Sequence, residues 1–104
     1  MSIRCICIND SSRPQEISPS LWIKKDQEYH ITHIFWHWQQ SIQGVELAEI
    51  FLDNSCFPYQ AFALNRFAIF KEDMEKFSKM LKDCSSLNDI EIGNLIEELN
   101  LETV

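Results

Sequence analysis

Residues 22–38 read WIKKDQEYHITHIFWHW, a charged turn followed by a long run of aromatic and β-branched residues. Such side chains pack best on a pleated surface, so residues 28–39 favour an extended strand over a helix. Alternation along a strand predicts two opposite faces: Tyr29, Ile31, His33, Phe35 and His37 on one, and His30, Thr32, Ile34, Trp36 and Trp38 on the other. Both faces become apolar toward Trp38, which predicts a strand that bends around a barrel or a hairpin tip with an aromatic patch.

Three other segments predict partners for this strand. Residues 3–8 form a short run that is mostly apolar on both sides, as expected of a strand inside a barrel. Residues 45–52 follow a polar connection over residues 39–44 and are expected to pair back on the aromatic strand. Residues 67–70, after a short helical turn within residues 61–66, are expected to close the sheet.

The last third of the chain changes to helical periodicity. One apolar stripe contains Phe70, Met74, Phe77, Leu81 and Cys84, and a second contains Ile92, Leu95, Ile96 and Leu99. The predicted fold class is therefore α+β, a small antiparallel β-barrel followed by two short helices. We expect a barrel over residues 1–70 and an acidic helical extension over residues 71–104, packed on or beside the barrel in a single domain.

Composition and charge limit the partners. The net charge is −7, and residues 71–104 hold four Lys/Arg against nine Asp/Glu. An acidic chain repels phosphate backbones, so nucleic acid is a disfavoured partner. No apolar run approaches the roughly 20 residues of a membrane helix, and no signal peptide is recognisable, so we expect a cytoplasmic protein. In that compartment the cysteines are expected to be free thiols: Cys5, Cys7, Cys56 and Cys84.

The sequence shows no group of residues spaced to form a catalytic, metal-binding or phosphate-binding site. Alternation separates His30 from the other two histidines, and His33 and His37 stand roughly 13 Å apart along a strand, too far to share one ion. The only glycines are Gly44 and Gly93, so no loop cradles a phosphate. We therefore predict no catalytic residue, no metal, no cofactor and no small-molecule substrate, and hence no enzyme.

Two segments carry a resemblance to a known group. Residues 21–31 (LWIKKDQEYHI) and 64–67 (LNRF) resemble the small SH3-like barrels of uncharacterised bacterial and phage proteins. In those barrels a Lys-x-Gly-x-x-Tyr-x-Val turn and strand precedes a short helical turn that ends in Arg-Phe. Here Asp26 stands at the Gly position, and residues 71–104 are an addition. The resemblance covers residues 1–70 and implies an SH3-like fold without implying an activity.

An aromatic surface is the remaining functional candidate. The partner-binding residues predicted from the sequence are Phe35, Trp36, Trp38, Phe57 and Tyr59. Part of such a set must enter the core, and the rest would form a hot spot for a protein partner or for self-association. The first hypothesis is a non-catalytic protein-interaction module that uses the aromatic strand, its hairpin and the loops. The alternative is a small acidic inhibitor or immunity-type protein, borne by a phage or mobile element, that blocks a basic site on a target protein.

The apolar hairpin leads to a prediction about oligomers. If two copies cover each other's residues 34–51 about a two-fold axis, Trp38→Glu converts a dimer to a monomer in sedimentation. If the C-terminal helices cover the hairpin within one chain, the same change lowers the stability of a monomer. A wild-type monomer whose stability ignores the change contradicts both versions.

Overall fold

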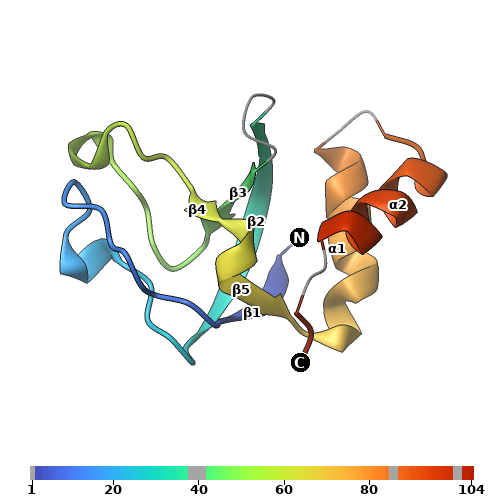
Figure 1. Cartoon of the computed structure of the whole chain (residues 1–104), viewed down its shortest axis with the longest axis horizontal. Helices are drawn as coiled ribbons and strands as arrows, with labels where there is room; N and C mark the ends of the chain where they lie inside the picture. Colours follow the sequence, from blue (N-terminus) through green and yellow to red (C-terminus); the bar gives the residue numbers. More distant parts are fainter. Residues whose placement is uncertain (1, 38–41, 85–86, 100–101) are drawn as a thin grey trace.

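The computed structural model describes residues 2–37, 42–84, 87–99 and 102–104 (Figure 1). Its strands are β1 (Ile3–Cys7), β2 (Glu28–His37), β3 (Ile42–Leu47), β4 (Phe62–Ala63) and β5 (Phe67–Ile69). Two α-helices follow, α1 (Met74–Asp83) and α2 (Asp89–Leu99), and short 3-10 turns are η1 (Pro19–Leu21), η2 (Asn54–Cys56), η3 (Leu64–Arg66) and η4 (Lys71–Asp73). The strands form one antiparallel sheet in the order β4-β3-β2-β1-β5, curled into a half-barrel. The predicted α+β class and the two C-terminal helices are confirmed.

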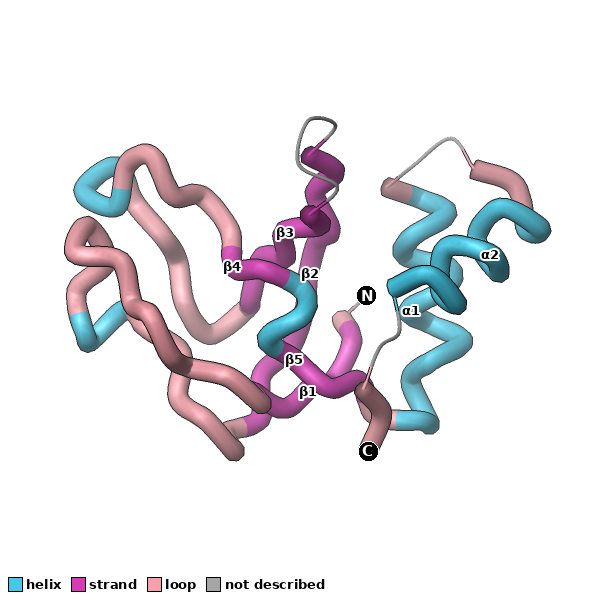
Figure 2. The backbone as a smooth tube through the Cα atoms, in the orientation of Figure 1, coloured by secondary structure: helices cyan, strands magenta, loops and turns pink. Residues whose placement is uncertain are grey.

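The sheet separates two layers. Figure 2 shows long loops on one side of the sheet and helices α1 and α2 on the other. The loop over residues 9–20 is anchored, because Trp22 Nε1 donates to the Asp10 carbonyl at 2.7 Å and Arg66 Nη1 donates to the Ser11 carbonyl at 2.7 Å. Ile17 in this loop is buried, so the loop packs against the rest of the chain.

β2 is the central strand, and its alternation breaks in the middle. Its register against β3 shifts between Ile31 and His33, which is a β-bulge. Tyr29, Ile31 and Ile34 are therefore all buried, whereas His33 is exposed. The predicted faces are wrong at His33 and Ile34, because counting every second residue cannot include the extra residue that a bulge inserts.

β3 begins and ends earlier than the predicted strand over residues 45–52. Gly44 was assigned to the connection but pairs with Phe35 inside the ladder. At the other end Ala48 N–H donates to the His30 carbonyl at 2.9 Å, but the His30 N–H donates to the Glu49 carboxylate at 2.9 Å. A side chain thus takes the place of a backbone acceptor, and the ladder stops there.

The helices share the core of the sheet. Phe77 and Leu81 of α1 and Ile92 of α2 belong to the same buried cluster as Ile3, Ile31 and other strand residues. Met80 is also buried, although it lies outside the predicted stripe. At the start of α1 the buried Asp73 accepts a hydrogen bond from the Arg4 backbone N–H at 2.8 Å, which ties the helix to β1.

This packing predicts a large effect of Phe77→Asp. The change leaves an unpaired carboxylate where a fully buried ring stood, so the free energy of unfolding should fall by at least about 3 kcal/mol. Lys79→Asp, on the exposed side of the same helix, should change it by no more than about 1 kcal/mol. Urea unfolding followed by circular dichroism measures both, and equal losses would mean that the Phe77 face does not hold α1 on the sheet.

Candidate functional site

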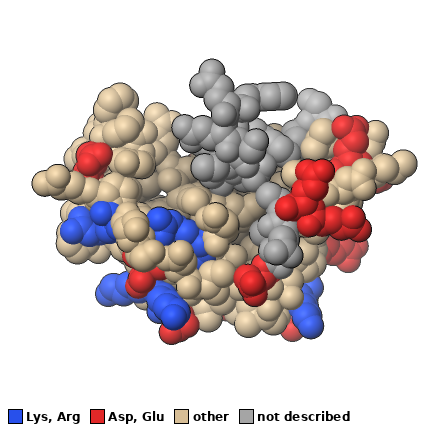
Figure 3. Space-filling view, viewed as in Figure 1, with Lys and Arg blue, Asp and Glu red and all other residues tan. Residues whose placement is uncertain are grey.

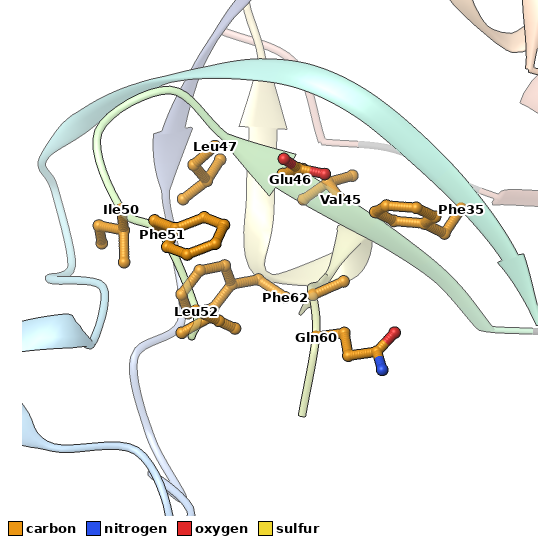
Figure 4. A pocket seen from close by; sticks show the side chains of 10 residues that line it. Phe35, Val45, Glu46, Leu47, Ile50, Phe51, Leu52, Gln60 and Phe62 are labelled. Carbon is orange, nitrogen blue, oxygen red and sulfur yellow. The ribbon is translucent and has the colours of Figure 1, made fainter. Parts of the chain in front are cut away.

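A pocket of ≈ 210 Å³, lined mostly by apolar residues but also by Glu46 and Gln60, opens beside β3. β3, Phe35 at the end of β2, residues 50–52 and residues 60–62 line it (Figure 4). Val45, Leu47 and Phe62 are buried and form its base, whereas Phe51 is 73% exposed. A concave apolar surface with an exposed ring beside it is suited to receive an apolar group.

The Glu49 carboxylate bonds to β2 directly before the pocket-lining residues 50–52. Glu49 Oε1 accepts the His30 backbone N–H at 2.9 Å, and Glu49 Oε2 lies 2.6 Å from His30 Nδ1. Partial burial raises the pKa of Glu49, but the hydrogen bonds from His30 outweigh it, so the pKa lies below its usual value. Because Glu49 directly precedes the lining residues 50–52, this contact fixes where they leave the sheet.

The next loop displays two more rings. Asp53 opens the 3-10 turn η2, where its carboxylate accepts hydrogen bonds from the Ser55 hydroxyl and, at 2.9 Å, from the Ser55 backbone N–H. The hydroxyl bond and, after it, the backbone bond lower the pKa of the Asp53 carboxyl. Cys56 at the end of the turn is fully buried and anchors the loop. Phe57 and Tyr59 then project outward, 74% and 39% exposed. The loop is fixed at its base and apolar at its tip.

The predicted partner-binding residues separate into three groups. Phe35 lines the pocket, with its ring 4.5 Å from that of His33. Phe57 and Tyr59 are exposed on the loop beside it. Trp36 lies in β2, but its side chain is outside the described part of the structure, as is the whole of Trp38.

Phe51 was missed as a site residue. The sequence assigned residues 45–52 to a strand, in which Phe51 would have shared a face with Val45 and Leu47. The available signal was the turn-forming run of Asp53, Asn54 and Ser55 directly after it, which marks residues 51–52 as the approach to a loop.

Among the thiols and imidazoles that the structure describes, none belongs to a site as well defined as the pocket. Burial raises the pKa of the Cys5 thiol to about 12 and also raises that of Cys7. The half-buried Cys84 has its Sγ 3.7 Å from His33 Nδ1. Among the described residues, no three His, Cys, Asp or Glu side chains gather closely enough to hold a metal ion.

Over the same ranges, no helix has the length and apolar character needed to cross a membrane.

Comparison with protein-family models, with curated proteins and with solved structures finds no match. The function therefore has to be inferred from the geometry of the pocket and its loops.

The Glu49 contact predicts a pH-dependent loss of stability. A carboxyl whose folded pKa is lowered stabilises the fold above its unfolded pKa, about 4.3, and this contribution disappears as the pH falls through the folded value. Wild type should therefore exceed Glu49→Gln in stability at pH 6, by up to about 1 kcal/mol for such a half-exposed pair. The difference should shrink below about pH 4. Thermal melts across pH measure it, with Glu98→Gln on the exposed face of α2 as the control, and a difference that persists undiminished at pH 3 would contradict the assignment.

Proposed function

We propose that the chain is a non-catalytic protein-binding module, and that the pocket beside β3 receives an apolar side chain of its partner. The observation that carries the proposal is the pocket itself, with a buried apolar base and Phe51 exposed beside it. Phe57 on the adjacent loop adds a second exposed ring. Large apolar side chains displayed together around a concavity are typical of protein-binding surfaces.

The charge of the protein further limits which partner segments would be complementary to the pocket. Glu46 is the charged residue among those that line the pocket, and the whole chain carries a net charge of −7. A partner segment with an apolar side chain flanked by Lys or Arg is therefore complementary to this surface. The free thiols suit a reducing compartment, and we place the protein in the cytoplasm.

The fold belongs, in this proposal, with the SH3-like barrels of bacterial and phage proteins. Three local features support it. Asp26 takes a φ of 70°, the left-handed conformation that the Gly of the resembling turn adopts readily. Lys24 N–H donates to the Tyr29 hydroxyl at 2.9 Å, which closes that turn over the strand. The helical turn η3 directly before Phe67 is the third shared element.

One observation favours the second candidate, an acidic inhibitor or immunity-type protein. Acidic side chains gather over α2, where Asp89, Glu91, Glu97 and Glu98 are all exposed (Figure 3). α2 carries no Lys or Arg. Such a helix would attract the basic site of a target, with an affinity that falls steeply as salt rises.

Phe51→Ala separates the two candidates once a partner is captured. A photo-crosslinking residue at position 57 in a lysate of the source cell captures the partner, which is then purified and titrated. Phe51→Ala should weaken binding at least tenfold, as expected for a hot-spot ring, and should leave folding intact because the ring is exposed.

The matched control is Ile90→Ala, which removes a side chain that is 77% exposed on α2. Under the pocket proposal it leaves binding unchanged, and affinity survives a rise to 0.5 M salt. Binding that ignores Phe51→Ala, and that is lost with salt or with Glu97→Lys, would replace the pocket by the acidic helix.

A further inference from the structure

The far edge of the sheet is occupied by residues 102–104 of the same chain. β5 is the terminal strand of the sheet, and residues 102–104 lie beside it in parallel, with Thr103 opposite Ile69 (Figures 1 and 2). Ile69 N–H donates to the Glu102 carbonyl at 2.9 Å, and Val104 N–H donates to the Ile69 carbonyl at 3.0 Å. Lys71 N–H donates to the Val104 carbonyl at 3.1 Å. These are the bonds by which an added strand extends a sheet.

The occupant is held by its backbone more than by its side chains. Residues 102, 103 and 104 are all exposed, and Val104 keeps 52% of its surface in water. β5 itself is buried on its faces, because Phe67, Ala68 and Ile69 belong to the interior. A segment with few buried contacts opens at a small fraction of the cost of global unfolding, whereas the strand beneath it stays in place. Each opening leaves an intact strand with unpaired backbone groups.

We propose that this edge of β5 is a strand-binding site, and that an extended segment of a partner protein binds it in parallel by displacing residues 102–104. Recognition falls on main-chain groups: a carbonyl at one position, and an N–H and a carbonyl two residues later. The residue between them, here Thr103, uses neither backbone group against β5 and tolerates any side chain. A proline is excluded at the position equivalent to Val104, because it lacks the N–H that bonds Ile69.

Because residues 102–104 compete for the edge of β5, a different protein is a better candidate for binding there than a second copy of this chain. A tethered segment is present at an effective concentration on the order of millimolar. The same segment from a second copy makes the same contacts, so it cannot compete below that concentration. A partner segment that adds side-chain contacts can compete. This site is independent of the pocket beside β3, because β4 and β5 are the opposite ends of the sheet.

Hydrogen exchange on the full chain tests whether the edge opens. The amides of Ile69 and Lys71 should exchange at least about tenfold faster than that of Ile8, which donates to the Arg66 carbonyl at 2.8 Å just beyond the β1–β5 pairing. Exchange of Ile69 only at the rate of global unfolding would mean that residues 102–104 are a permanent part of the sheet, and would overturn the proposal.

Peptide binding tests whether the open edge accepts a strand. The probe is a synthetic peptide with the sequence of residues 97–104, titrated into the full chain and into its Val104→Pro variant, whose own segment lacks one bond to β5. The variant should keep the circular dichroism spectrum of wild type and bind the peptide at least about tenfold more tightly than wild type does. N-methylation of the peptide at the Val104 position should weaken binding at least about fivefold, whereas N-methylation at the Thr103 position should not.

Equal binding of the two methylated peptides, or no binding to the variant, would overturn the strand-binding site. A wild-type dimer at micromolar concentration that is lost in Val104→Pro would instead identify a second copy as the occupant, and would overturn the assignment to a different partner. Each of these results leaves the pocket proposal untouched, since none of the variants changes a residue of the pocket.

Discussion

β2 pairs with β1 through residues 28–31 and with β3 through residues 31–37, and the bulge between Ile31 and His33 lies where the two pairings meet. Without the extra residue, regular alternation would place Ile34 on the opposite face from Tyr29 and Ile31, and would turn His33 inward. That arrangement loses a fully buried isoleucine and buries an imidazole in its place, which costs several kcal/mol unless the ring finds partners. The bulge also increases the local twist, as a sheet that curls into a half-barrel requires.

The outward turn of His33 has consequences on both sides of β2. Its Nδ1 meets Cys84 Sγ at 3.7 Å, so the last turn of α1 lies against the strand at this point. Its ring meets that of Phe35 at 4.5 Å, and Phe35 in turn lines the pocket. His33, which the bulge turns outward, therefore contacts both the end of α1 and a residue that lines the pocket. The same irregularity therefore lies beside both the end of α1 and one wall of the pocket.

Periodicity predicted what is local. The strand of residues 3–8, most of β2, the turn before Phe67 and both helices each carry their signal within a few residues of sequence. The features that it missed depend on partners far along the chain. β3 ends where the Glu49 side chain takes a backbone bond from His30, nineteen positions away, and no propensity encodes that exchange. The pairing of residues 102–104 with β5 spans more than thirty residues and is made by backbone hydrogen bonds, while the exposed side chains of this segment give no strand pattern.

The candidate site also divides into residues that the local sequence predicts and residues that depend on distant contacts. Phe35, Phe57 and Tyr59 are predicted as an aromatic surface from where aromatic residues cluster in the sequence, and the structure places the first in the pocket and the other two on its neighbouring loop. Phe51 was hidden because an apolar residue after a strand looks like more strand. The position of Phe51 follows from Glu49, whose side chain bonds to His30 where the ladder ends. Residues 50–52 then leave the sheet, so that Ile50 and Leu52 are partly buried while Phe51 is exposed. The Glu49 carboxylate therefore bonds to β2 just beyond the last residue of β3, and residues 50–52 line the pocket instead of extending the ladder. Because it acts through two hydrogen bonds to a single residue of the central strand, the shape of the pocket depends on the same strand as the core.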